Sequence, residues 1–353
     1  MNARLVLCPI CLESVEWAGQ DLFLRDGGKY VPLATPTTNP NKLAVLRRSA
    51  YWRCPNPAGD TADHYLPWAY ASYRPPVVVG LVGDSRAGKS HLLAGMILEI
   101  ERGGLQPYGL GWEPLDAVRH AAFHAEVVER VLGGERLPPT NPGVVEFADA
   151  LLIKSPVTGS WPVAFFDIAG EGFQRGEREG RFVIGTRGLI FVVDPATALG
   201  VVGAEPGNGG RTQDLAFAAV LAQLRALLAP GQTYLDLAAV MVVNKADRLR
   251  LRHPVDTWMR PHDGDGHVDP ARIRAESRDA YAFLYQHRSA WPWLAPFDTF
   301  RRCTLHFASA TGGEERDGRY PRGFRPRRVL EPLVALFAMT GVLAGPEMTE
   351  VGI

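Results

Sequence analysis

The sequence predicts an α/β fold in which a mostly parallel sheet, with one antiparallel hairpin strand, carries helices on both faces. From Val77 onward, short apolar runs rich in β-branched residues alternate with segments of helical periodicity, as in parallel α/β sheets. Two runs, 144–153 and 162–167, are joined by the short segment SPVTGS, which favours an antiparallel hairpin. Ahead of Val77 the texture is irregular and includes the cysteine knuckle Cys8-Pro9-Ile10-Cys11. This knuckle indicates a small metal-binding module at the N-terminus.

The expected elements follow one another in a regular order. Strands are expected at 77–82, 144–153, 162–167, 188–193, 237–243 and 303–308. Helices are expected at 89–101, 212–228, 270–286 and 329–340. Pro75 and Pro76 mark the boundary between a module at 1–74 and a domain at 75–345. The domain contains an insertion at about 103–135, with a helix at AVRHAAFHAEVVERVL, and residues 346–353 are expected to form a tail.

The composition is that of an ordinary globular protein. Of 353 residues, 46% are apolar and 22% are charged, and the formal net charge is zero. Zero net charge argues against a general nucleic-acid or membrane footprint. The start, MNARLVLCPICLESV, has no long apolar core, and the late run VLEPLVALFAMTGVLAG falls short of the roughly 20 residues of a membrane span. We therefore expect a cytoplasmic protein with no membrane partner.

A glycine-rich turn follows the first strand of the domain. Residues 83–90, GDSRAGKS, fit G-x-x-x-x-G-K-[ST] between an apolar run and a helical segment. Glycines let backbone N–H groups wrap around phosphate oxygens, Lys89 would reach the β- and γ-phosphates, and Ser90 would offer its hydroxyl to Mg²⁺. The positive end of the following helix attracts the same anion. The residues expected at the nucleotide are Gly83, Asp84, Ser85, Arg86, Ala87, Gly88, Lys89, Ser90 and His91.

A second motif concerns the base. Residues 244–247, NKAD, fit N-K-x-D at the end of the strand expected at 237–243. With this motif after a phosphate loop, the chain resembles the P-loop GTPases of the TRAFAC class, to which Ras-like proteins belong. The resemblance implies that Asp247 accepts hydrogen bonds from guanine N1 and N2, that Lys245 lies over the base, and that Asn244 ties the two loops together. Adenine lacks the paired donors, so a buried carboxylate rejects it.

Two further motifs match the same class. Asp167 ends a strand and begins D-x-x-G with Gly170. In the family, Asp167 would hold Mg²⁺ through water and the Gly170 N–H would meet the γ-phosphate. Ser309, Ala310 and Thr311 follow the last expected strand and resemble the S-A-[KL] loop, whose N–H at Ala310 would contact guanine O6.

The resemblance also suggests three catalytic residues. Thr140, which follows the insertion, is expected to complete the Mg²⁺ shell, with Thr158 as the alternative. Glu171 stands where a water-positioning Gln is usual, so it would either orient water or mark slow hydrolysis. Arg136 precedes Thr140 by four residues and is either an arginine finger supplied in cis or a solvated loop arginine.

The cysteines predict a structural metal site. Cys8 and Cys11 offer two thiolates at the spacing that binds one tetrahedral ion. Cys54 and His64 would complete a Cys₃His zinc site, and buried free thiols are the alternative. Cys303 lies in a strand pattern and is expected in the core.

The arrangement of motifs is similar to the zinc-ribbon-bearing branch of the bacterial double-GTPase proteins, which are components of NTP-dependent conflict systems encoded beside a partner GTPase. The similarity rests on the knuckle, the insertion, and the segments DIAGEGF, FVVDP and RVLEPLVAL. It implies a Mg²⁺-dependent GTPase that binds GTP and GDP and acts as a regulatory switch for a protein partner, either a second GTPase or an effector. Two alternatives stay open: a GTP-binding scaffold with negligible hydrolysis, and an RNA- or ribosome-associated GTPase using the arginines of 316–328. Zero net charge argues against nucleic acid as a partner.

Overall fold

A computed structural model describes most of the chain. The described residues are 4–17, 21–33, 39–138, 145–168, 182, 185–199, 215–226, 228–260 and 268–353. Thr140, Gly170 and Glu171 lie outside these residues. None of the helices in the described ranges has the length and apolar character needed to span a bilayer.

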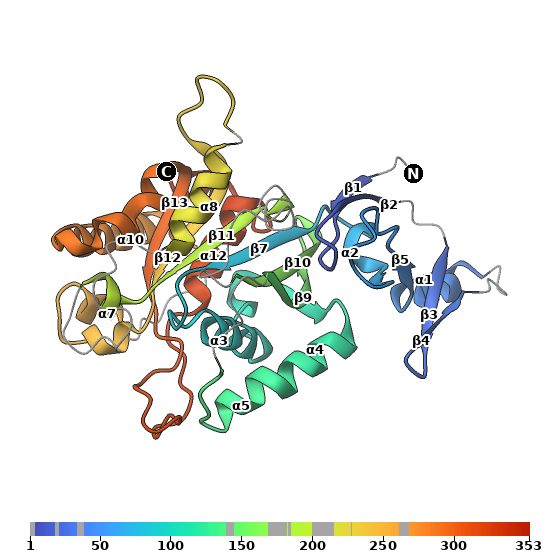
Figure 1. The fold of residues 1–353 in the computed structure, drawn as a ribbon, viewed down its shortest axis with the longest axis horizontal. Coiled ribbons are helices and arrows are strands. Elements are labelled where there is room, and N and C mark those ends of the chain that lie inside the picture. The colour runs from blue at the N-terminus through green and yellow to red at the C-terminus, as the bar shows by residue number, and fades with distance from the viewer. Residues whose placement is uncertain are drawn as a thin grey trace.

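The centre of the molecule is a mixed, mostly parallel sheet of seven strands in the order β13-β12-β11-β7-β10-β9-β8 (Figure 1). Its strands are β7 (Val77–Val82), β8 (Gly111–Pro114), β9 (Val145–Ser155), β10 (Gly159–Ile168), β11 (Gly188–Val193), β12 (Leu235–Val243) and β13 (Phe300–Phe307). Five strands run parallel, while β9 pairs antiparallel with both β10 and β8. The α/β class and the antiparallel hairpin are therefore confirmed. The sequence analysis missed β8, a short edge strand inside the insertion.

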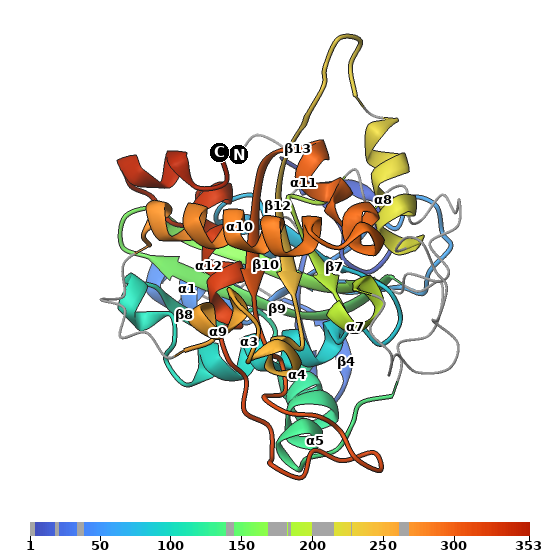
Figure 2. The same cartoon turned by 90° about the vertical axis from the view of Figure 1, so that its left-hand side faces the viewer.

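Helices cover both faces of the sheet (Figures 1 and 2). They are α3 (Lys89–Glu101), α4 (Ala117–Phe123), the π-helical η2 (His124–Val128), α5 (Glu129–Leu132), α7 (Pro195–Ala198), α8 (Leu215–Arg225), α9 (Val255–Trp258), α10 (Pro270–Tyr285), α11 (Ala295–Thr299) and α12 (Leu330–Thr340), with 3₁₀ turns η1 (Gln106–Tyr108), η4 (Ala246–Leu249), η5 (Arg288–Leu294) and η6 (Pro346–Glu350).

Successive side chains of a strand point to opposite faces of the sheet, so each strand contributes to two cores. Val77 and Val79 of β7 belong to the core that includes buried residues of α3 and α12, whereas Val78 and Val82 belong to the core that includes α8 and α10. Strands with both faces covered need an unbroken apolar run, as β7 and β11 have.

The N-terminal module contains two small antiparallel sheets. β1 (Arg4–Leu7) pairs with β2 (Ser14–Trp17), and a second sheet has the order β4-β3-β5-β6. The remaining elements are β3 (Leu22–Asp26), β4 (Lys29–Pro32), α1 (Pro40–Arg48), β5 (Tyr51–Arg53), β6 (Tyr65–Pro67) and α2 (Ala69–Ser72). The sequence analysis predicted none of these short strands.

The module and the central sheet share one apolar core. The hydroxyl of the buried Tyr70 donates to the carbonyl of Leu7 at 2.8 Å. The side chain of Leu7 fills the space over Gly185, where an added Cβ would lie 2.6 Å from it. Residues of the module and of β10 therefore belong to one continuous buried cluster.

Residues 346–353 do not form the expected free tail. The N–H of Cys303 donates to the carbonyl of Gly352 at 3.0 Å, and the guanidinium of Arg302 donates to the carbonyls of Met348 and Val351 at 2.8 Å. Val351 is fully buried. The segment covers the backbone of β13, which would otherwise be an exposed sheet edge.

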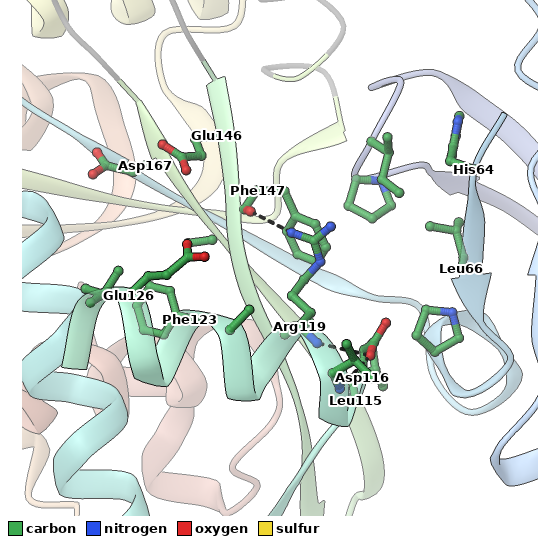
Figure 3. Close-up of a pocket in the computed structure, with 18 of the residues that line it drawn as sticks. His64, Leu66, Leu115, Asp116, Arg119, Phe123, Glu126, Glu146, Phe147 and Asp167 are labelled. Carbon is green, nitrogen blue, oxygen red and sulfur yellow. Dashed lines mark hydrogen bonds between the residues drawn. The ribbon is translucent and has the colours of Figure 1, made fainter. Parts of the chain in front are cut away.

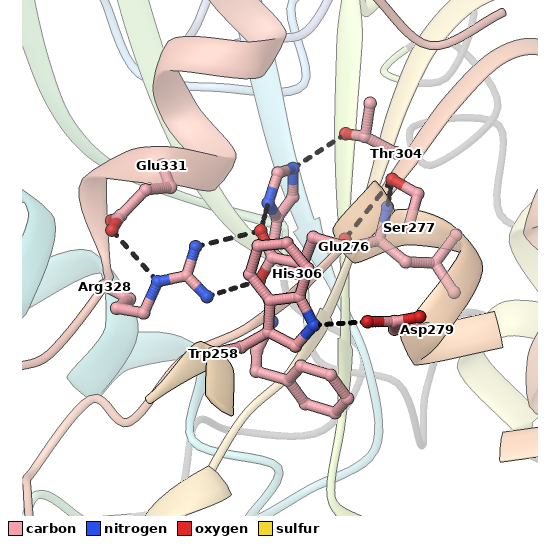
Figure 4. A network of polar contacts seen from close by, with 10 residues as sticks. Trp258, Glu276, Ser277, Asp279, Thr304, His306, Arg328 and Glu331 are labelled. Atoms are coloured by element: carbon pink, nitrogen blue, oxygen red, sulfur yellow. Dashed lines mark hydrogen bonds and ion pairs between the residues drawn. The ribbon is translucent and has the colours of Figure 1, made fainter. Parts of the chain in front are cut away.

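A buried polar network lies behind the carboxyl end of β13 (Figure 4). Glu276 of α10 accepts two hydrogen bonds from Arg328, at 2.5 and 2.9 Å, and lies 3.0 Å from His306 Nδ1. It also accepts from the N–H of Phe307 at 3.0 Å. Burial alone would raise the pKa of Glu276, but His306 and Arg328 lower it from 4.5 to about 2. The network fixes the end of β13 against α10 and the segment before α12.

Replacing Glu276 by Gln is expected to destabilise the protein by about 3–5 kcal/mol at pH 7, because Arg328 then keeps an uncompensated buried charge. The pKa of Glu276 is lower in the folded than in the unfolded chain, so its contribution is complete above about pH 4.5 and is lost as the pH falls toward 2. Urea unfolding of both proteins between pH 7 and pH 3 measures this difference. A stability gap that stays constant or widens on acidification would contradict the assignment.

Candidate functional site

The expected nucleotide-binding residues lie together at the carboxyl ends of the parallel strands. The glycine-rich loop follows β7, Asp167 lies near the end of β10, and Asn244 follows β12. Ser309 follows β13. Ligands of open α/β sheets bind outside the carboxyl ends of the strands, so the topology brings these separate motifs to one place.

The glycine-rich loop is shaped by close backbone contacts. Lys89, which is buried, donates from Nζ to the carbonyls of Gly83 and Asp84 at 2.9 and 3.1 Å. Gly88 has φ +90°, and a Cβ on it would lie 2.6 Å from the amide nitrogen of Asn244. A Cβ on Gly83 would lie 2.6 Å from the carbonyl oxygen of Val192. A side chain at either glycine would therefore clash with its neighbours. The helix α3 begins at Lys89, so the unpaired N–H groups of its first turn lie at the loop.

Asn244 joins the loop to the end of β13. Its amide nitrogen donates to the carbonyl of Ala87 at 2.9 Å, and its amide oxygen accepts from the N–H of Ala310 at 3.0 Å. The side chain is buried, so both polar ends find partners inside the protein. One amide thus holds three loops in a fixed relation.

Asp247 presents a buried carboxylate beside this amide. The hydroxyl of Ser309 donates to Asp247 Oδ1 at 2.5 Å, and Ser309 in turn accepts from the N–H of Gly312 at 3.0 Å. This contact orients Asp247, because one of its two carboxylate oxygens is held by the protein. The arrangement suits recognition of a base that offers paired N–H donors.

Lys245 is held across the loop by a residue that the sequence analysis did not assign to the site. Its Nζ donates to the carbonyl of Arg86 at 2.8 Å and to Asp194 Oδ2 at 2.6 Å. The other oxygen of Asp194 caps α7 by accepting from the N–H of Ala196 at 2.9 Å. The available signal was the segment FVVDP, an acidic residue directly after a strand on the same sheet edge.

The opposite end of the loop has the oxygen donors that Mg²⁺ prefers. The hydroxyl of Ser90 donates to Asp167 Oδ2 at 2.5 Å, and Asp167 is buried. A serine hydroxyl and a carboxylate next to a phosphate-binding loop fit an octahedral ion that also takes phosphate oxygens and water. Thr158 lies on the β9–β10 turn, nine residues before Asp167 and so about 30 Å away along an extended strand. The alternative assignment of Thr158 to Mg²⁺ is therefore wrong.

A cavity of about 900 Å³ leads from this end of the site to the N-terminal module (Figure 3). Its lining includes Ser90 and Asp167 of the site and Pro9 and His64 of the module, and Figure 3 shows Asp167 and His64 on opposite sides of it. Glu126 and Glu146 lie near Asp167 in Figure 3. Burial, together with the charges of Asp167 and Glu126, raises the pKa of Glu146. The cavity carries carboxylates near the expected Mg²⁺ position, and charged residues such as Arg25, Asp63 and Asp116 also belong to its lining.

The metal cluster of the module consists of Cys8, Cys11, Cys54 and His64. All four are buried, and their ligand atoms lie within 4.8 Å of one another. The sulfur atoms of Cys11 and Cys54 are 3.7 Å apart, as expected for two thiolates at about 2.3 Å from one tetrahedral ion. The N–H of Ile10 donates to the sulfur of Cys8, and that of Asn56 donates to the sulfur of Cys54, both at 3.4 Å.

The same groups are chemically suited to a thiophilic metal. Hydrogen bonds with Cys54 and Cys8 lower the pKa of the Cys11 thiol, whereas burial raises the pKa of Cys8. His64 Nδ1 lies 2.8 Å from the carbonyl of Ala62, which leaves Nε2 facing the cysteines. A donor set of three thiols and one oriented imidazole fits a closed zinc site, and zinc there would stabilise the fold. Cys303 is buried in β13, in the core as expected.

Purified protein is expected to carry one zinc ion per chain, measured by elemental mass spectrometry. Replacing Cys54 by Ser removes one of the three thiolates, so the metal content should fall well below one and the melting temperature should drop. Cys303→Ala is the matched control and should keep one ion. Full zinc occupancy in Cys54→Ser, or none in the unaltered chain, would contradict the metal assignment.

Comparison with known proteins does not assign this chain to a family. No protein-family model and no curated protein matches the sequence. Among solved structures, the chain is similar to the one titled "Crystal structure of bacterial selenocysteine-specific elongation factor EF-Sec", with 15% sequence identity and a TM-score of 0.24. The match covers 67% of this chain and 26% of the elongation factor chain, so the likeness spans about a quarter of that protein. The interpretation of the site therefore depends on its own residues.

Proposed function

We propose that the protein binds GTP and hydrolyses it with Mg²⁺. The observation that carries the proposal is the set of contacts by which Asn244 joins the glycine-rich loop to the Ala310 N–H, while the neighbouring Ser309 holds the Asp247 carboxylate. A phosphate-binding turn and a base-reading carboxylate at one sheet edge are the two parts that a guanine-nucleotide site needs.

The base would be selected by Asp247. Its carboxylate would accept from guanine N1 and N2, and Ser309 holds the carboxylate in the required orientation. The N–H of Ala310 would meet guanine O6, and the stem of Lys245 would cover the ring. Adenine would leave the buried carboxylate without donors, which costs about 1–3 kcal/mol or more.

The phosphates would lie in the loop of residues 83–90, with Lys89 between the β- and γ-phosphates. Bound Mg²⁺ would neutralise developing phosphate charge, held by Ser90 and Thr140 directly and by Asp167 through water. The N–H of Gly170 would contact the γ-phosphate, and Glu171 would place the attacking water. The roles of Thr140, Gly170 and Glu171 rest on the family resemblance alone.

We further propose that the GTPase is a regulatory switch in a bacterial multi-protein system of the conflict type, as its similarity to the double-GTPase proteins suggests. A partner would distinguish the GTP-bound from the GDP-bound form by binding near Ser90 and Asp167. These two residues line the 900 Å³ cavity, which also contacts the zinc module. Residues 1–74 would act as a structural zinc module and residues 75–345 as the GTPase domain. A GTP-binding scaffold with negligible hydrolysis is the second candidate, because Glu171 adds negative charge beside a phosphate that repels it.

The first experiment is single-turnover hydrolysis of GTP by the purified protein with Mg²⁺, with ATP in parallel and Lys89→Ala as the inactive control. A rate near 10⁻² s⁻¹ is the level expected when an arginine acts in cis, whereas tight binding with a rate below about 10⁻³ s⁻¹ would mean that catalysis waits for a partner or does not occur. Equal turnover of ATP would refute the role of Asp247.

Asp247→Asn tests the base assignment by a change of specificity. The variant exchanges one carboxylate acceptor for an N–H donor, so GTP affinity should fall about 100-fold or more. Xanthosine triphosphate, which has a carbonyl where guanine has its amino group, should bind the variant better than GTP does. Competition against a fluorescent guanine nucleotide measures both affinities. Unchanged GTP binding by the variant would place the base elsewhere.

A further inference from the structure

One long loop leaves the base-reading end of β13 and returns to it. We call residues 312–325 the strap. The N–H and carbonyl of Ser309 bond with those of Arg327 at 3.0 and 2.9 Å, and the N–H of Arg325 donates to the carbonyl of Thr311 at 3.0 Å. Both ends of the strap are thereby fixed to the loop that holds Asp247. In Figures 1 and 2 the strap is the orange-red loop that extends toward α5.

The outer part of the strap pairs with the end of the insertion. The N–H of Tyr320 donates to the carbonyl of Gly134 at 2.7 Å, and the N–H of Arg136 donates to the carbonyl of Gly318 at 2.9 Å. The guanidinium of Arg136 also pairs with Glu315 at 2.9 Å. Both the backbone and the side chain of Arg136 therefore have partners in the strap.

A third contact reaches the phosphate-binding helix itself. His91, the residue after Ser90, has two polar neighbours at Nε2: the hydroxyl of Tyr320 lies at 3.1 Å, and the N–H of Leu137 donates at 3.4 Å.

Through these contacts the strap connects the expected base-binding end of the site to its expected phosphate-binding end. One end of the strap is bonded at Ser309. Its outer part is bonded to Arg136 and, through Tyr320, to His91, which follows the loop of residues 83–90. Leu137, the residue after Arg136, donates from its N–H to His91 at 3.4 Å, which places the backbone next to Arg136 against the first turn of α3. The segment after Arg136 leads toward Thr140, the expected Mg²⁺ ligand.

We propose that the strap positions Arg136 toward the phosphates, with Glu315 and Tyr320 as positioning residues. Glu315 holds the guanidinium of Arg136 through an ion pair. Tyr320 fixes the position of the strap relative to α3 through its contact with His91. Arg136 is the group that would touch the phosphates. This inference rests on the proposed GTPase activity and adds to it the residues that aim its arginine. An aiming error of about 1 Å can cost about 10²-fold in rate.

Single-turnover GTP hydrolysis and GTP affinity, measured on the full chain, test the proposal. Glu315→Gln and Tyr320→Phe are expected to slow hydrolysis roughly 10- to 100-fold while the Kd for GTP stays within about threefold, because the error falls on the transition state. Arg136→Ala should be slowed at least as much. The double variant Arg136→Ala with Glu315→Gln should be no slower than Arg136→Ala, since Glu315 acts only through Arg136.

Glu314→Gln is the matched control. Glu314 is the neighbouring strap carboxylate, is largely exposed, and lies 3.5 Å from Arg248 instead of Arg136, so its loss should leave the rate unchanged. Melting temperatures of all variants exclude unfolding as the cause. If the wild-type protein hydrolyses GTP and Glu315→Gln hydrolyses it at the same rate, the strap proposal is overturned and the GTPase function stays intact. The same conclusion follows if the rate losses of Arg136→Ala and Glu315→Gln add in the double variant. Bound GTP without measurable hydrolysis would also overturn it, whereas absence of GTP binding would overturn the proposed function itself.

Discussion

The contact on which the candidate site depends is the close approach of Asn244 to Gly88. A side chain on Gly88 would displace the amide, and without the amide the loops after β7, β12 and β13 would lose their common anchor. The requirement is geometric: three loops from three strands need one buried group with both a donor and an acceptor. The network of Glu276 is organised in the same way: one buried carboxylate bonds to the N–H of Phe307 at the end of β13 and to Arg328 in the segment before α12.

The central elements were predictable because local pattern and burial agree there. β7, α3 and β11 have the predicted bounds, 77–82, 89–101 and 188–193, since their apolar runs are bounded by glycine turns or polar residues. The short strands of the module carry no such run. β1, β5 and β6 have three or four residues each, and their order depends on shared core residues and a metal cluster that join distant parts of the chain. The C-terminal segment was misjudged because its role is to cover an edge strand, which no local pattern reveals.

The site was predictable where a motif lies next to its strand and unpredictable where a contact spans the chain. Lys89, Asp167, Asn244 and Asp247 were identified by motifs that resemble those of P-loop GTPases, each lying beside a predicted strand. Tyr320 and His91 are 229 residues apart, and Arg136 and Glu315 are 179 apart, so periodicity and motif order cannot pair them. Asp194 is intermediate: its place after β11 was visible, but its contact with Lys245 required the sheet order.

The shared core of the module and the sheet has a thermodynamic consequence. Leu7, Tyr70 and Phe166 belong to one buried cluster that also includes Cys8, Cys11 and Cys54, so the metal cluster and the candidate nucleotide site share one core. Any coupling between two ligands of one protein is reciprocal: if the nucleotide changes the affinity for the metal by some factor, the metal changes the affinity for the nucleotide by the same factor. On the proposed function, zinc availability in the cell would then change the affinity for nucleotide as well as the stability of the fold.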